Sequence, residues 1–236
     1  MSRRIIVFVV IAVALAAVFV RLGLWQLGRL AERRAQNADM ALRLAEPEVP
    51  WNTLGTLDGA RLRRTVVSGE ADTAAEFAIL GRSRSGSPGV WIITPVRVVG
   101  ESAAVLVNRG WVYAPDASTV DLARWRERRT EYHGHTMRIA TAGAVNVKGR
   151  GLRAFDSSGV DSLLPYPFAP LYVVLQDSGH IDSIPARLPV PVLDNGPHLN
   201  YAIQWFAFAA VALAGAAIVA RKSRVTSRDA NIHKIP

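Results

Sequence analysis

The chain of 236 residues contains no cysteine. Disulfide bonds, thiolate metal sites and a cysteine nucleophile are therefore excluded. Only Met1, Met40 and Met137 offer sulfur to a soft metal, which disfavours a copper chaperone. The sequence also lacks a phosphate-binding glycine loop, a zinc-binding helix and a nucleophile elbow. A membrane-bound hydrolase or ligase thus has no motif in its favour, and we expect a protein that is not an enzyme.

Acidic residues are few relative to basic ones, since 19 Asp and Glu stand against 28 Lys and Arg, for a net charge of +9. Nucleic-acid binding would gather this charge on one stripe or one amphipathic element. Here part of it lies at the two ends of the chain and the remainder is scattered. We therefore expect no nucleic-acid partner.

The first of two long apolar runs covers residues 5–20. As a helix it spans roughly 24 Å, less than the ~30 Å core of a bilayer, so the predicted span extends to residue 27. Arg21 would then reach the outer interface, where Trp25 would also lie. A signal peptide is the alternative, but its candidate cleavage site at residues 14–16 lies inside the apolar run. An uncleaved anchor is the better interpretation.

The second run, residues 199–220, spans roughly 33 Å as a helix and is followed by Arg221, Lys222 and Arg224. Such a basic flank marks the cytoplasmic side of a span, as Arg3 and Arg4 do for the first. The predicted order is a cytoplasmic N-terminus at 1–4, a transmembrane helix at 5–27, an extracytoplasmic domain at 28–197, a second transmembrane helix at 198–220 and a basic cytoplasmic tail at 221–236.

The middle of the chain begins with a helical extension over residues 28–44, which prolines at positions 47 and 50 end. Short segments rich in β-branched residues follow. They cover residues 64–69, 76–80, 91–99, 103–112, 135–147 and 171–177. The segments 91–99 and 103–112 predict an antiparallel hairpin. We expect a membrane-anchored α+β protein, with two transmembrane helices flanking an antiparallel, barrel- or sandwich-like β domain.

Polar and aromatic residues are concentrated where the second span begins. At helical spacing His198, Tyr201, Trp205 and Phe208 share one stripe. One interpretation is an interface cap, with the rings at headgroup depth. The other is a haem-facing patch, with the imidazole as iron ligand. The residues alone leave both interpretations open.

Three motifs occur in order along the chain. Residues 22–30 read LGLWQLGRL, residues 105–112 read VLVNRGWV and residues 197–206 read PHLNYAIQWF. In order, spacing and topology they resemble the surfeit locus protein 1 family of cytochrome c oxidase assembly factors. In the first motif, Trp25 is expected at the membrane interface and Gln26 in contact with a helix.

The resemblance implies that His198 occupies the position of the family's proposed haem-contacting histidine, with Tyr201 and Trp205 beside it. Pro197 and Gln204 belong to the same motif. Haem a, bound transiently, is the implied cofactor. No metal is expected beyond the haem iron.

The central motif holds Asn108, Arg109, Gly110 and Trp111. A structural role is the simpler interpretation, because glycine permits an unusual backbone angle and tryptophan packs. Arg109 could instead meet a carboxylate of a partner or a haem propionate. The resemblance links Gly110 to the integrity of the family's fold.

The implied function is assembly of haem a-type cytochrome c oxidase, by assisting haem a insertion or by stabilising the haem-loaded core. The implied partners are haem–copper oxidase subunits, with haem a synthase and a respiratory supercomplex as further candidates, and the lipid membrane. The implied location is the bacterial plasma membrane, or the mitochondrial inner membrane, with both termini on the cytoplasmic or matrix side. A stable accessory subunit of a respiratory supercomplex, without haem, is the alternative.

Overall fold

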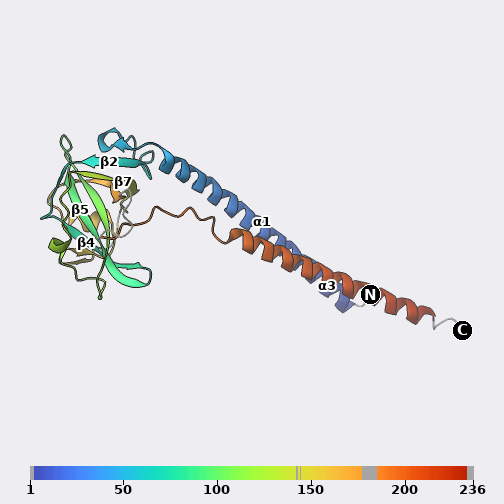
Figure 1. Cartoon of the computed structure of the whole chain (residues 1–236). Helices are drawn as coiled ribbons and strands as arrows, with labels where there is room; N and C mark the ends of the chain where they lie inside the picture. The colour runs from blue at the N-terminus through green and yellow to red at the C-terminus, as the bar shows by residue number, and fades with distance from the viewer. Residues whose placement is uncertain (1–2, 142, 144, 177–184, 233–236) are drawn as a thin grey trace. The chain divides into compact units, whose positions relative to one another are not determined.

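The computed structural model describes residues 3–141, 143, 145–176 and 185–232, with side chains described as far as Ser223 (Figure 1). Its chain divides into two compact units. One unit combines residues 1–39 with residues 193–236, and the other holds residues 40–192. Positions 142, 144 and 177 of the predicted strands, and the ends of both predicted tails, lie outside the described residues.

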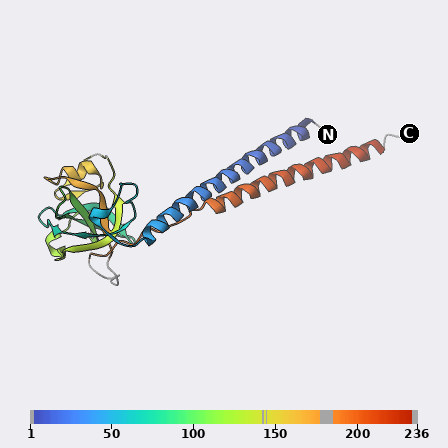
Figure 2. The same ribbon diagram turned by 90° about the horizontal axis from the view of Figure 1, so that it is seen from above.

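The first unit contains two long helices, α1 (Arg3–Ala45) as far as Asp39, and α3 (His198–Ile232). By length and composition, Arg3–Ala45 and His198–Ser223 are both candidates to cross a membrane. The two helices run side by side in opposite directions, so that α1 starts beside the later part of α3, which extends beyond it (Figures 1 and 2). The predicted first span and its helical extension are therefore one continuous helix.

Each of the two helices has a row of buried residues, most of them small. In α1 the buried positions Ala16, Gly23, Leu30 and Asn37 recur every seven residues, and in α3 Ala202, Ala209 and Ala216 do the same. Small side chains let two backbones approach closely, and a seven-residue repeat is typical of a left-handed helix pair.

Gly23 illustrates how close this approach is. A Cβ added at Gly23 would lie 2.7 Å from the ring of Phe206, which is far inside van der Waals contact. The aromatic ring of α3 thus packs directly on the backbone of α1 at this level. Glycine costs helix stability, and here its small size makes the packing fit.

The second unit is one ten-stranded sheet with the strand order β1-β2-β7-β10-β6-β5-β4-β9-β8, and with β3 paired to β5. The strands are β1 (Val49–Pro50), β2 (Arg64–Ser68), β3 (Glu70–Ala71), β4 (Phe77–Arg84), β5 (Ser87–Arg97), β6 (Ala104–Tyr113), β7 (Glu131–Arg138), β8 (Val147–Lys148), β9 (Gly151–Leu152) and β10 (Phe168–Leu175). Two short 3-10 helices, Trp51–Thr53 and Leu122–Trp125, and the helix α2 (Ser157–Asp161) connect them.

The prediction of an antiparallel sheet was wrong, because the sheet is mixed. The pairs β10–β6, β1–β2 and β4–β9 are parallel, and the other pairs are antiparallel. Parallel strands cannot be joined by a tight turn. The chain leaves β6, forms β7, β8, β9 and α2, and only then returns as β10 beside β6. The hairpin of β5 and β6 was confirmed, with Val96 opposite Val105 next to the turn.

Both faces of the central strands are buried, which explains their nearly continuous apolar sequences. Along β5, Ile93 packs with Leu106 on one face, while Ile92 packs with Val112 on the other. The ten strands belong to a single sheet that curves around its interior (Figure 1).

Candidate functional site

The second helix begins at a sharply defined point. Gly196 has a φ of +70°, a conformation that glycine adopts without strain, and its N–H donates to the Asp194 side chain at 3.0 Å. Pro197 follows with its fixed φ, and its carbonyl accepts from the Tyr201 N–H at 3.1 Å. His198 is therefore the first residue of α3.

His198 contacts α1 through a specific hydrogen bond. Its Nδ1 lies 2.8 Å from Oε1 of Gln26, and the ring is half-buried. An amide oxygen only accepts hydrogen bonds, so Nδ1 carries the proton. In the neutral imidazole this leaves Nε2 with a free lone pair, the form in which histidine binds a metal.

The aromatic residues of the predicted stripe divide into two groups. Trp205 and Phe208 pack against Phe19 of α1, with ring centroids 5.7 and 5.8 Å apart. Phe208 is nevertheless 51% exposed, and Tyr201 is 46% exposed. The buried side of α3 is the alanine row beginning at Ala202, and Tyr201 lies at its margin. Tyr201 is thus accessible to a ligand or to lipid, while Trp205 packs within the helix pair.

Three further residues of the two helix motifs, Trp25, Pro197 and Gln204, face outward. Trp25 is 57% exposed, and Gln204 and Pro197 are also exposed. Just before the start of α3, a polar contact that was not predicted from the sequence joins α1 to the segment leading into α3. Asn37 donates to the side chain of Asn195 at 3.1 Å, and its position in the seven-residue repeat was the available signal.

The central motif lies in β6, inside the sheet unit. Gly110 has a φ of +128°, and a Cβ there would lie 2.4 Å from the carbonyl oxygen of Ala186. The next residue, Trp111, exchanges two backbone hydrogen bonds of 2.8 Å with Ala186. Asn108 accepts from the Gly110 N–H at 3.0 Å and so holds the irregular backbone of this site. Gly110 therefore permits the close approach of residues 185–192.

Arg109 is the centre of a buried ionic network. Its guanidinium lies 2.8 Å from the Glu76 carboxylate, and the two side chains are 1% and 2% exposed. Thr94 bridges them, donating to Glu76 and accepting from Arg109, both at 2.6 Å. On its other side Arg109 lies 3.3 Å from Glu127, which also binds Arg187 at 2.9 Å. A buried charge needs such compensation, and Arg109 is fully engaged within the sheet unit.

No group of three or more His, Cys, Asp and Glu suited to a metal ion exists among the described residues. His133 lies 2.9 Å from Glu48 through Nδ1 and 3.8 Å from Glu131 through Nε2, so the two carboxylates approach different ring nitrogens and do not converge on one point.

The chain thus combines two apolar terminal helices, a mixed sheet formed by the residues between them in the sequence, and a histidine at the start of the second helix. The chain belongs to the SURF1 family, whose family model matches residues 13–210. It is 24% identical over 202 residues to a SURF1-like protein of Rickettsia felis, covering 81% of this chain and 87% of the relative. An uncharacterized SURF1-like protein of Mycobacterium tuberculosis (strain ATCC 25618 / H37Rv) is 27% identical over 219 residues, which are 84% and 76% of the two chains. The resemblance seen in the three motifs is confirmed.

Proposed function

We propose that this protein is a membrane-anchored assembly factor for haem a-type cytochrome c oxidase, and that it is not an enzyme. The observation that carries the proposal is the hydrogen bond between His198 and Gln26, which couples the two helix motifs of the family. Membership of the family supplies the link to oxidase assembly.

The residues at the start of α3 fit a haem. Gln26 orients the His198 ring and directs its proton to Nδ1, so that Nε2 is the atom offered to iron. The exposed ring of Tyr201 provides an apolar surface one turn further along the helix. Haem a, when bound, supplies the iron centre that accepts this imidazole. The pair of helices holds and orients Nε2 of His198. Transient binding of haem a requires no further contribution from the helix pair.

The proposal places the sheet unit outside the cytoplasm and both chain ends inside. It is supported by two candidate spans that run in opposite directions, and by the basic residues Arg3, Arg4, Arg221 and Lys222 at the same end of the pair. The bacterial plasma membrane is the proposed location, and haem–copper oxidase subunits are the proposed partners, with haem a synthase and a respiratory supercomplex as further candidates.

The experiment compares oxidase maturation in cells that carry the wild-type chain, His198→Ala or His133→Ala. The control residue His133 is exposed on β7 of the sheet unit. We expect mature oxidase to fall with His198→Ala and to remain normal with His133→Ala, at equal levels of membrane-inserted protein. Co-purification of the chain with mature oxidase in a fixed ratio, unchanged in His198→Ala, would contradict the proposal and favour a permanent accessory subunit.

A further inference from the structure

The sheet unit contains a cavity of about 780 Å³ that the proposed function does not use. Its floor is formed by β5, β6, β7 and β10, and its wall by residues 185–192, which we call the proline-rich strap. Pockets that bind small organic molecules typically enclose about 300–1,000 Å³. The cavity therefore has the size of a ligand site.

Aromatic rings dominate the floor. Trp91 of β5 and Trp111 of β6 are direct cross-strand partners, so their indoles project from neighbouring positions of the same face. Met137 of β7 and Tyr172 of β10 are partners in the same way. Faces of aromatic rings favour a planar ligand, because rings stack on one another and on thioether sulfur.

The charge at the cavity is positive. Arg84 and Arg187 line it, Arg187 being paired with Glu127 at 2.9 Å, and the guanidinium of Arg82 lies 4.5 Å above the centre of the Trp91 ring. The described lining residues include no carboxylate. Nε of Arg82 is buried and has no hydrogen-bond partner among the described residues. Burial also lowers the pKa of Arg82, which means that its charge is poorly solvated. An anionic ligand would supply both a negative counter-charge for the Arg82 guanidinium and a hydrogen-bond acceptor for its Nε.

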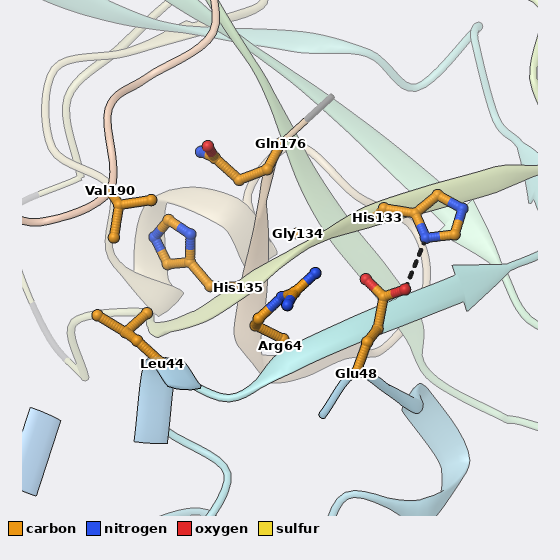
Figure 3. Close-up of a pocket in the computed structure, with 8 residues that line it drawn as sticks. All are labelled: Leu44, Glu48, Arg64, His133, Gly134, His135, Gln176 and Val190. Atoms are coloured by element: carbon orange, nitrogen blue, oxygen red, sulfur yellow. Dashed lines mark hydrogen bonds and ion pairs between the residues drawn. The ribbon is translucent and has the colours of Figure 1, made fainter. Parts of the chain in front are cut away.

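A second polar group faces the same space. His135 is 3% exposed, and its Nδ1 has no hydrogen-bond partner among the described residues. Its ring separates the cavity from a smaller one of about 330 Å³, where it lies among Leu44, Gln176 and Val190 (Figure 3). Burial lowers the pKa of His135 to about 4, so the imidazole is neutral near pH 7. Unpaired buried polar atoms are uncommon in folded proteins. One of them belongs to His135, which lines this cavity, and another to Arg82, which lies over the lining residue Trp91.

We propose that the cavity under the proline-rich strap binds a planar aromatic carboxylate, with its ring on Trp91 and Trp111 and its carboxylate toward Arg82. The aromatic floor selects the planar body, and Arg82, whose buried Nε has no partner among the described residues, selects the negative charge. This site lies within the sheet unit and shares no residue with the His198 site, so it goes beyond the proposed function.

The test measures binding of naphthalene carboxylate to the full-length chain in lipid nanodiscs by titration calorimetry, with empty nanodiscs as the blank. Naphthalene methanol, which has the same rings and no charge, and acetate, which has the charge and no rings, are the comparison ligands. We expect saturable binding of naphthalene carboxylate, at least about tenfold weaker binding of the alcohol because a charge-assisted hydrogen bond is lost, and none of acetate. Absence of saturable binding, or equal binding of the alcohol, would overturn the proposal.

Two matched variants locate the site. Arg82 and Arg97 both lie on an aromatic ring, Arg82 over Trp91 at 4.5 Å and Arg97 over Tyr166 at 4.1 Å, but Arg97 is not part of the cavity. Arg82→Gln should weaken binding at least about tenfold, while Arg97→Gln should leave it unchanged. Equal affinities of the two variants would overturn the assignment. His198→Ala should bind the probe normally, which separates this test from that of the proposed function.

Discussion

Replacing Gly110 with alanine should destabilise the sheet unit far more than the same change at another glycine of positive φ. At Gly110 the added Cβ would lie 2.4 Å from the Ala186 carbonyl oxygen, and the φ of +128° is unfavourable for any residue with a Cβ. The backbone strain is about 1–3 kcal/mol. If the proline-rich strap moves away to relieve the contact, the two hydrogen bonds between Trp111 and Ala186 are lost, at about 0.5–1.5 kcal/mol each.

The expected loss is therefore about 2–6 kcal/mol, a large part of the roughly 5–15 kcal/mol that stabilises a typical protein. The control is Gly100→Ala, because Gly100 also has a positive φ, +85°, but an added Cβ there meets nothing within 4 Å. Its cost should be limited to about 1–3 kcal/mol of strain. Denaturant unfolding of both variants, followed by tryptophan fluorescence, measures the difference. If Gly110→Ala is no less stable than Gly100→Ala, the close approach of the strap does not explain this glycine.

Three further predictions concern the helix pair, the buried imidazole and the topology. Gly23→Leu should separate the two helices and lower the midpoint of thermal unfolding, whereas Gly28→Leu, where an added Cβ meets nothing within 4 Å, should not. The pKa of His135 is lowered from 6.5 to about 4, so protonation favours the unfolded state. The stability it contributes, about 3 kcal/mol, is complete above pH 6.5 and disappears as the pH falls to about 4, and unfolding of His135→Gln should lack this dependence. Reporters fused at Ser118 and at Ser227 should lie on opposite sides of the membrane, and finding both on one side would refute the proposed topology.

The local features of the fold could be predicted from the sequence, and the non-local ones could not. The hairpin of β5 and β6 depends on two adjacent apolar segments and a short turn between them. The parallel pairing of β6 with β10 depends on a connection that spans residues 114–167, and no periodicity reports it. A strand buried on both faces also loses the polar–apolar alternation that would reveal its neighbours.

The candidate site shows the same limit. The motif around His198 was visible in the sequence, but the pairing of its Nδ1 with Gln26 joins residues 172 positions apart. The burial of Arg109 likewise required knowing that Glu76 lies across the sheet from it. The seven-residue spacing of small residues in both helices, by contrast, was present in the sequence and would have indicated which faces meet.

The most direct test of the proposed function is the haem a content of the chain purified from cells that make haem a. Wild-type protein should contain haem a, and His198→Ala should contain none. Gln26→Leu should retain less haem a than the wild type, because loss of the hydrogen-bond partner of a ligating histidine typically lowers metal affinity by about 10–100-fold. All three proteins should be equally folded and inserted in the membrane. Equal haem a in wild type and His198→Ala, or haem-free wild-type protein, would contradict the account.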